Sequence, residues 1–279
     1  MARVVNVITG SPTSAAYHLR RGSQRFCTSY PTALHILLQR ALAGMANTSP
    51  PGRRVEPLTW FRLLEVLRIL PSKVAQFVAS LDRAAFLRAY SASLRVGEFA
   101  KSASTEHTLR LGEVSFAENQ SSVTLTLSSY KHSKRPAKLV LPASTERAHG
   151  VCPVEALKVY LSVRPKGEGV LFRHRNGSGL NRSQVASILK TCAEAVGLDP
   201  KDYDTHSFRA GRTTDLVEAG YSDGIIRESG RWSSDAYLKY VRFDLFKVPR
   251  GLGDQSCGVG GLPADVGLGV VCDPTPRSN

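Results

Sequence analysis

The segment SGRWSSDAYLKYVR, residues 229–242, decides how the rest of the chain is interpreted. It places Trp232 ahead of two tyrosines, Tyr237 and Tyr240, that are three residues apart in a basic stretch. A tyrosine hydroxyl ordinarily loses its proton only at a pH of about 10, so it becomes a nucleophile only beside a base in an electropositive site. Taken alone, the segment fits either two ordinary aromatic residues on a helix or one nucleophile with a supporting neighbour.

The composition limits the classes of protein that the chain can belong to. Its 279 residues are 42% hydrophobic, which is enough for a substantial core, and its net charge is +14. Such a basic balance predicts a polyanionic partner, most commonly nucleic acid, although a basic surface used only for solubility has the same composition. The start MARVVNVITG lacks the pattern of a secretory signal, and no apolar run is long enough to span a membrane. We therefore expect a soluble intracellular protein with no membrane partner.

Cysteine usage argues against a metal centre. The five cysteines include no CxxC pair, and His149 with Cys152 has no second pair to complete a zinc site. The sequence also has no phosphate-binding loop and no cluster of acidic residues suited to a metal. We expect no metal, no cofactor and no small-molecule substrate.

Changes in composition divide the chain into four parts. The segment TSPPGRRVEP, residues 48–57, carries three prolines and predicts a linker. Residues 1–47 contain helical stretches over 15–26 and 30–45, too little to bury a core alone. Residues 58–250 carry the patterns of a folded domain. The last part, 251–279, is rich in glycine without periodicity, so we expect it to be disordered.

The folded part predicts a mainly α domain with a small antiparallel β-sheet. Apolar residues at helical spacing predict helices over 58–71 and 80–101, the second capped by Ser80 or Asp82. Alternating residues predict strands that form a hairpin, and apolar periodicity resumes after it. The strands are expected over 121–131 and 137–143, with a basic turn at 132–136, and the later helices over 152–164, 180–197, 204–220, 222–230 and 233–243. Asp204 or Thr205 would cap the helix over 204–220.

Two pairs of residues on the predicted helices could handle a phosphate. His206 and Arg209 are three apart near a helix start, so they share a face with the positive end of the helix dipole. A neutral imidazole can accept a proton, and a guanidinium can hold two phosphate oxygens. Arg95 ends an apolar helix three residues before Glu98, and a salt bridge between these two is an equally good interpretation. A solvated histidine and a surface arginine would likewise explain the first pair.

Basic residues also gather at the tip of the predicted hairpin. Lys131 and Lys134 lie there together with Arg135 and Lys138. A solvated turn or a nuclear localisation stretch would have the same composition. The hairpin therefore marks a candidate contact with a polyanion, but its composition alone does not assign it one.

The order of these features resembles the tyrosine recombinase, or phage integrase-like, family. The resemblance rests on THSFRAG (205–211), SGRWSSDAYLKYVR (229–242) and LRVGEF (94–99), and it extends over roughly 55–245. DIRS-type retrotransposons and Cryptons carry similar strings. The resemblance implies a catalytic domain of that family in 58–250 and a remnant of its amino-terminal helical core-binding domain in 1–47, shortened by the gene model or by decay of the element.

The resemblance also implies roles around one scissile phosphate. Arg95 and Arg209 would hold its non-bridging oxygens, and His206 would take the tyrosine proton or steady the phosphate. Trp232, in a place often held by a second histidine, would donate its N–H to a phosphate oxygen. Tyr240, eight residues after Trp232, would be the nucleophile.

The remaining roles are assigned by the same resemblance. Lys131, or Lys134 if the hairpin register differs, would protonate the leaving 5′ oxygen. Tyr237 would support Tyr240 from one turn earlier, and Glu98 would orient the region around Arg95. Further basic residues are predicted to contact DNA, namely Lys134, Arg135, Lys138, Arg212 and Arg231.

The implied function is recombination or integration of DNA through a 3′-phosphotyrosyl intermediate, in a protein of a mobile element. The partners would be double-stranded DNA and further copies of this chain, as a tetramer on DNA. The protein would be nuclear in a eukaryote and otherwise cytoplasmic and associated with DNA. The short amino-terminal part leaves a second interpretation, a non-catalytic DNA-binding remnant, because it removes phosphate contacts that supply affinity.

Overall fold

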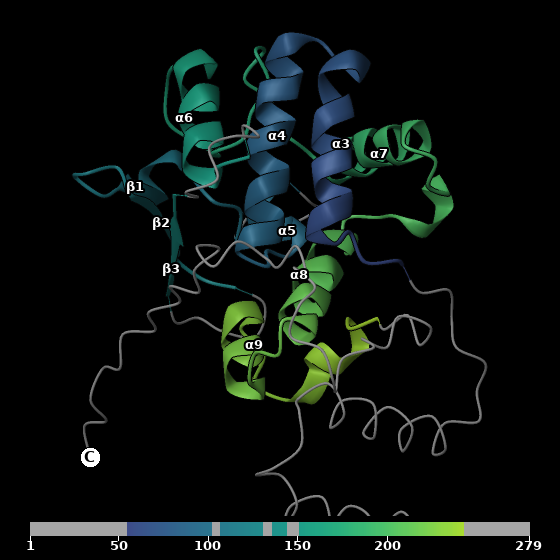
Figure 1. The fold of residues 1–279 in the computed structure, drawn as a ribbon. Helices are drawn as coiled ribbons and strands as arrows, with labels where there is room; N and C mark the ends of the chain where they lie inside the picture. Colours follow the sequence, from purple (N-terminus) through teal and green to yellow (C-terminus); the bar gives the residue numbers. More distant parts are fainter. Residues whose placement is uncertain (1–54, 102–106, 131–135, 144–150, 243–279) are drawn as a thin grey trace, which may run out of the picture.

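A small sheet lies at one edge of a group of helices in the computed structural model, which describes residues 55–101, 107–130, 136–143 and 151–242 (Figure 1). The predicted mainly α fold with a small antiparallel sheet is confirmed. The predicted helices over 15–26 and 30–45 and the predicted tail over 251–279 lie outside the described residues. Within the described ranges, no helix has both the length and the apolar character needed to cross a membrane.

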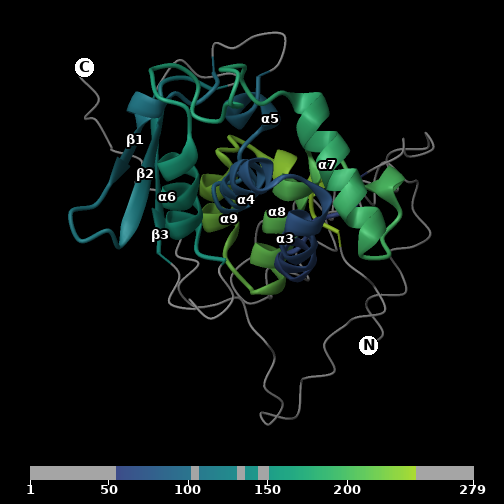
Figure 2. The ribbon, with the colours of Figure 1, turned by 90° about the horizontal axis from the view of Figure 1, so that it is seen from above.

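Two long helices form the centre of the domain. Helix α3 (Trp60–Lys73) buries Leu63, Val66, Leu67 and Leu70 along one face, at the helical spacing that predicted it. Helix α4 (Gln76–Ser91) is buried on most of its sides, and it lies between α3 and the elements next to the sheet (Figure 2). The apolar content of both helices therefore reflects a single shared core.

The single helix predicted over 80–101 is wrong in its bounds. Helix α4 begins at Gln76, so Ser80 and Asp82 lie inside it and neither caps it. The chain then leaves the helix after Ser91 and turns through Ser93, whose φ is 45°, before the short helix α5 (Val96–Phe99). Apolar spacing could not reveal this turn, because Leu94 continues the helical pattern and is buried from the turn itself.

The sheet has the order β1-β2-β3 and is antiparallel throughout. Strands β2 (Ser122–Leu127) and β3 (Ala137–Pro142) confirm the predicted hairpin, although its tip, 131–135, lies outside the described residues. Burial alternates along β2, and Leu125 pairs with Leu139 across the hairpin. The short strand β1 (Val114–Phe116) follows a 3-10 turn (Leu111–Glu113), and three residues are too few to give a strand pattern in sequence.

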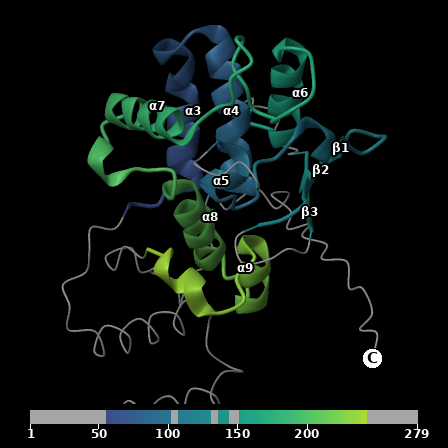
Figure 3. The same cartoon turned by 180° about the vertical axis from the view of Figure 1, so that it is seen from behind.

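The helices after the sheet complete the core and carry the candidate site. Helix α6 (Pro153–Val163) packs against α4 and β3. Helix α7 (Arg182–Ala195) lies beside α3, and a 3-10 turn (Pro200–Asp202) follows it. Helices α8 (Ser207–Glu218) and α9 (Asp223–Gly230) pack against each other at the end of the domain away from the tops of α3 and α4 (Figure 3).

Two predicted details of these last helices are corrected. Helix α8 begins at Ser207, so Asp204 and Thr205 precede it without capping it; the amide of Asp204 instead donates to Ser207 Oγ at 3.1 Å. The helix predicted over 233–243 is a 3-10 turn over Asp235–Lys239. That turn suffices to bury Tyr237 and then Val241 against α8 and α9.

The chain enters the domain along α8. The amide of Leu58 donates to the carbonyl of Ser207 at 2.9 Å, and the amide of Trp60 donates to the Asp215 carboxylate at 2.6 Å. Gly211 lies at the closest approach, where a Cβ atom would overlap the carbonyl group of Leu58 and come within 2.9 Å of the Thr59 nitrogen. A glycine is therefore required for the entering segment to lie against α8.

We expect Gly211→Ala to lower the free energy of unfolding by about 3 kcal/mol, because the added methyl group would push against backbone that cannot move aside cheaply. Urea denaturation followed by circular dichroism measures this. Gly224→Ala is the matched control on α9, since its nearest neighbour atom is Ser222 Oγ at 4.0 Å, and it should be neutral or stabilising by up to about 1 kcal/mol. Equal stabilities for the two variants would contradict the close approach.

Asp82 generates a second prediction, on pH. Its side chain is fully buried in α4, neither carboxylate oxygen has a hydrogen-bond partner among the described residues, and burial raises its pKa to about 7. The folded state therefore holds this proton more tightly than the unfolded state, so the associated stability is present at acidic pH and is lost as the pH rises through about 7.

Asp82→Asn should consequently be more stable than the parent at pH 8, with the advantage shrinking as the pH falls toward 4. Urea midpoints measured between pH 4 and pH 8 test this. Glu194→Gln, which changes an exposed carboxylate on α7, is the control. An advantage for Asp82→Asn that does not vary with pH would show that the carboxyl is not the cause.

Candidate active site

The start of α8 lies at the centre of the candidate site. Arg209, in the first turn, is only 1% exposed, and its guanidinium donates to the main-chain carbonyls of Ser93 and Gly230. Arg209 therefore joins three segments: the turn before α5, helix α8 and the end of α9. Its Nε has no hydrogen-bond partner among the described residues. A guanidinium has more N–H groups than these two bonds use, so donors remain for an anion.

Aromatic rings enclose the Arg209 guanidinium. Its central carbon lies 4.0 Å from the centroid of the Trp232 ring and 5.5 Å from that of Tyr240. The Trp232 and Tyr240 centroids are 5.5 Å apart, and those of His206 and Tyr240 are 6.5 Å apart. The structure thus brings together four of the predicted residues, with the face of the indole against Arg209.

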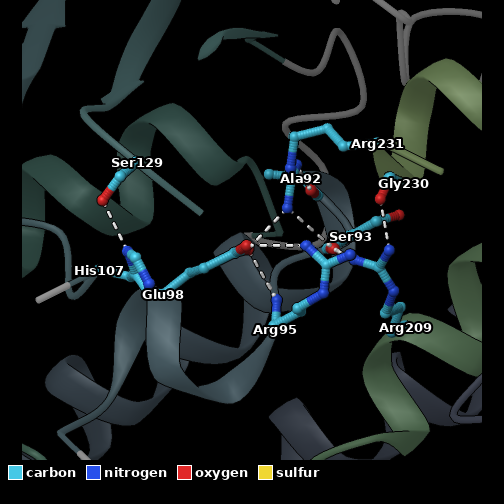
Figure 4. A network of polar contacts seen from close by, with 9 residues as sticks. All are labelled: Ala92, Ser93, Arg95, Glu98, His107, Ser129, Arg209, Gly230 and Arg231. Carbon is cyan, nitrogen blue, oxygen red and sulfur yellow. Dashed lines mark hydrogen bonds and ion pairs between the residues drawn. The ribbon is translucent and has the colours of Figure 1, made fainter. Parts of the chain in front are cut away.

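Arg95 joins this group from the other side. It precedes α5, and Glu98 accepts both its backbone amide at 2.8 Å and its Nη1 at 3.2 Å. The Arg95 side chain is 22% exposed, and its guanidinium lies next to that of Arg209 (Figure 4). Burial, and then repulsion from Arg95, lowers the pKa of Arg209. The salt bridge to Glu98 and the predicted closeness of the two arginines are therefore both present.

The two tyrosines have different environments. Tyr237 is fully buried, and its ring centroid lies 6.1 Å from that of Trp232. Burial, followed by the nearby Asp223, raises the pKa of Tyr237, which disfavours its phenolate. Tyr240 is only partly buried and lies among His206 and Arg209. Of the two tyrosines, Tyr240 is therefore the more accessible one and the one next to His206 and Arg209, whereas Tyr237 is buried against Trp232.

The predicted DNA contacts divide into three groups. Lys131, Lys134 and Arg135 lie outside the described residues. Lys138 is exposed on β3, so its contact with DNA stays a prediction.

Arg212 and Arg231 are the third group, and the side chains of both are buried. Arg212 is 1% exposed and lies 5.7 Å from the Tyr90 ring centroid, and the Arg231 side chain is 3% exposed and pairs with Glu98. Neither guanidinium is open to solvent in this arrangement, so direct contact of Arg212 or Arg231 with DNA stays a prediction.

Three features of the site were not expected from the sequence. The first is the Arg231–Glu98 ion pair, with a distance of 2.6 Å between Arg231 Nη2 and the carboxylate. The second is Tyr130, whose ring centroid lies 5.7 Å from the Arg231 guanidinium carbon. The third is a hydrogen-bond contact of 2.6 Å between His107 Nδ1 and Ser129 Oγ (Figure 4). The one signal in the sequence is the arginine next to Trp232, which the resemblance assigns to DNA contact.

Metal ligands are not grouped in the part of the chain that the structure describes. No set of three or more His, Cys, Asp or Glu side chains there could hold a metal ion. Cys152 and Cys192 are both buried and unpaired by disulfides.

Comparison with known proteins identifies the family. The Phage integrase family matches residues 61–242, well over half of the chain. The chain therefore belongs to the phage integrase family of tyrosine recombinases. Among curated proteins, none matches the chain.

Solved structures share the fold at low sequence identity. The XerH site-specific recombinase bound to a palindromic difH substrate, in a post-cleavage complex, is similar with a TM-score of 0.54 and 16% identity over 70% of this chain. The match covers 52% of that XerH chain, about half of its length. The XerA recombinase is similar with a TM-score of 0.50 and 15% identity, over 83% of this chain and 79% of XerA. The predicted tyrosine recombinase-like catalytic fold is thereby confirmed.

The charge environment of His206 yields a prediction. Partial burial, and then the positive charge of Arg182, lowers the pKa of His206, while Asp204 acts in the opposite direction. Arg182 and Asp204 also lie 3.4 Å apart as an ion pair. The neutral imidazole, which can accept a proton, is therefore favoured near neutral pH.

We expect the His206 imidazole to titrate below its usual range in a histidine NMR titration. Arg182→Gln should raise the midpoint, because it removes a repulsive charge and releases Asp204 from its partner. Lys190→Gln, on the same helix α7, is the control for loss of one charge. A midpoint that does not respond to Arg182→Gln would show that the arginine does not set the proton affinity.

Proposed function

We propose that this protein cuts and rejoins DNA strands, with Tyr240 as the nucleophile and a 3′-phosphotyrosyl link as the intermediate. The observation that carries the proposal is the meeting of a partly exposed tyrosine with His206, Arg209 and Trp232. Family membership supports it, because tyrosine recombinases as a class break and rejoin DNA.

The reaction follows from these residue types. The Tyr240 oxygen attacks the scissile phosphorus, the bond from phosphorus to the 5′ oxygen breaks, and that oxygen leaves as a hydroxyl after gaining a proton. Attack by the hydroxyl of another strand reverses the step, so the energy of the phosphodiester bond is conserved. His206 would accept the tyrosine proton. Arg95 and Arg209 would stabilise the negative charge that grows on the non-bridging oxygens.

Access to the phosphate-binding arginine involves the aromatic rings. Because Arg209 is 1% exposed and lies against Trp232 and Tyr240, a phosphate can reach it only after these rings shift. Attack by Tyr240 also needs its hydroxyl to come within hydrogen-bond distance of a base, and catalytic bonds of this kind commonly tighten when substrate binds. A movement of the segment that carries both rings would satisfy both needs.

The wider setting belongs to the same proposal. The partner would be double-stranded DNA, bound in part through exposed Lys138 and the basic hairpin tip, with the protein acting as a tetramer. The motif strings support an origin in a mobile element of the DIRS or Crypton type. In a eukaryote the protein would act in the nucleus, and otherwise on DNA in the cytoplasm.

A second candidate function is DNA binding without turnover. The enclosure of Arg209, with two main-chain carbonyls already bound to it, favours this candidate because a catalytic arginine must be reached by the phosphate. The two candidates differ in one measurable property, the formation of a covalent bond to DNA.

Covalent trapping decides between them. The protein is incubated with a library of duplexes of randomised sequence, each nicked so that the cut 5′ end diffuses away and religation is prevented. We expect a protein–DNA adduct that survives denaturing electrophoresis, with the phosphate attached to Tyr240 by mass spectrometry. Tyr240→Phe should abolish the adduct.

Tyr237→Phe is the matched control, because it removes a buried hydroxyl from the neighbouring tyrosine and should leave adduct formation intact. Retention of duplexes on a filter without any adduct, in a library that covers all core sequences, would reject the enzyme and support the binding protein. If Tyr237→Phe loses the adduct and Tyr240→Phe keeps it, the nucleophile is Tyr237.

A further inference from the structure

Arg231 makes a set of buried contacts that its predicted role as a DNA contact does not explain. Its Nη1 donates to the carbonyl of Ala92 at 3.1 Å, and its Nη2 lies 2.6 Å from the Glu98 carboxylate (Figure 4). The side chains of Arg231 and Glu98 are 3% and 2% exposed. Two buried charges are tolerated only when they are well paired, so the burial of Arg231 and Glu98 depends on the contact between them.

Arg231 has a backbone conformation that residues other than glycine rarely adopt. Arg231 ends α9 in the left-handed conformation, with φ 56° and ψ 47°, at a position that usually carries glycine. The preceding residue is a glycine for a different reason: a Cβ atom at Gly230 would overlap the ring of Trp232. An arginine held in a conformation that costs backbone free energy is consistent with a role for its guanidinium.

The contacts of Arg231 reach each part of the candidate site. Through Glu98 it is connected to Arg95, whose amide and Nη1 bind the same carboxylate. Its guanidinium carbon lies 5.7 Å from the ring centroid of Tyr130, the residue before Lys131 in the chain. Arg231 is also the residue directly before Trp232 in the chain, and the Trp232 ring lies against Arg209.

We propose that Arg231 is a positioning residue, which through its buried ion pair with Glu98 fixes Trp232 and Tyr240 relative to Arg95 and Arg209. Arg231 touches no DNA in this arrangement and acts through the residues that it holds. The consequence for strand cleavage rests on the proposed function, whereas the positioning of Trp232 does not.

Fluorescence tests the positioning directly. The chain has two tryptophans, so a Trp60→Phe background leaves Trp232 as the only reporter. Arg231→Met, which keeps the length of the side chain but not its charge, should shift Trp232 emission to longer wavelength and increase its quenching by acrylamide. Glu98→Gln should do the same, and the double variant should be no worse than either single one, because both break the same contact.

Single-turnover cleavage of trapped duplexes tests the catalytic consequence. Arg231→Met should slow adduct formation at saturating DNA by about 100-fold, as expected for a misplaced nucleophile, with the affinity for DNA unchanged. Arg231→Lys restores the charge and should recover part of the rate; it also serves if Arg231→Met does not fold. Lys158→Met, which removes a charge from a surface pair with Glu155, should change neither readout.

Each outcome has a distinct meaning. Unchanged Trp232 emission in Arg231→Met and Glu98→Gln would overturn the inference, as would a loss of DNA affinity with an unchanged cleavage rate, which would make Arg231 a DNA contact. If the parent protein forms no adduct, the proposed function fails, and the fluorescence of the same variants still decides whether Arg231 positions Trp232.

Discussion

The arrangement of the site depends on the two ion pairs of the buried Glu98 carboxylate. Glu98 is 2% exposed. It pairs with Arg95, which directly precedes α5, and with Arg231, which follows the last residue of α9. Without this negative charge, the guanidinium groups of Arg95, Arg209 and Arg231 would repel one another in a region that water hardly reaches. Loss of one partner from such a buried pair typically costs about 3–5 kcal/mol. Glu98 therefore makes it possible for these three guanidinium groups to lie close together.

The aromatic rings complement this charge in a second way. Trp232 and Tyr240 lie against Arg209, and a ring face attracts a cation without neutralising it. The rings thus hold Arg209 in place without removing its positive charge. His206, favoured in its neutral form by burial and by Arg182, completes a site that combines strong anion attraction with a group able to accept a proton.

Much of the fold and several site residues could be predicted from the sequence, because they depend on local patterns. The strand alternation in β2 and the apolar face of α3 gave correct elements. The break after Ser91 could not be predicted, since Leu94 continues the apolar spacing through it. Nor could the buried ion pair of Arg231, because the charge of a residue gives no information about its burial, and its partner Glu98 is more than a hundred positions away in the chain.

The contact between the entering chain and α8 has a mechanical consequence. Hydrogen bonds at Leu58 and Trp60 attach that segment to the helix that begins next to His206 and contains Arg209, and Gly211 lets the two backbones meet without a side chain between them. The segment over residues 58–60 is therefore joined directly to the helix that contains Arg209. A shift of this segment would have to break both hydrogen bonds or carry α8 and Arg209 with it.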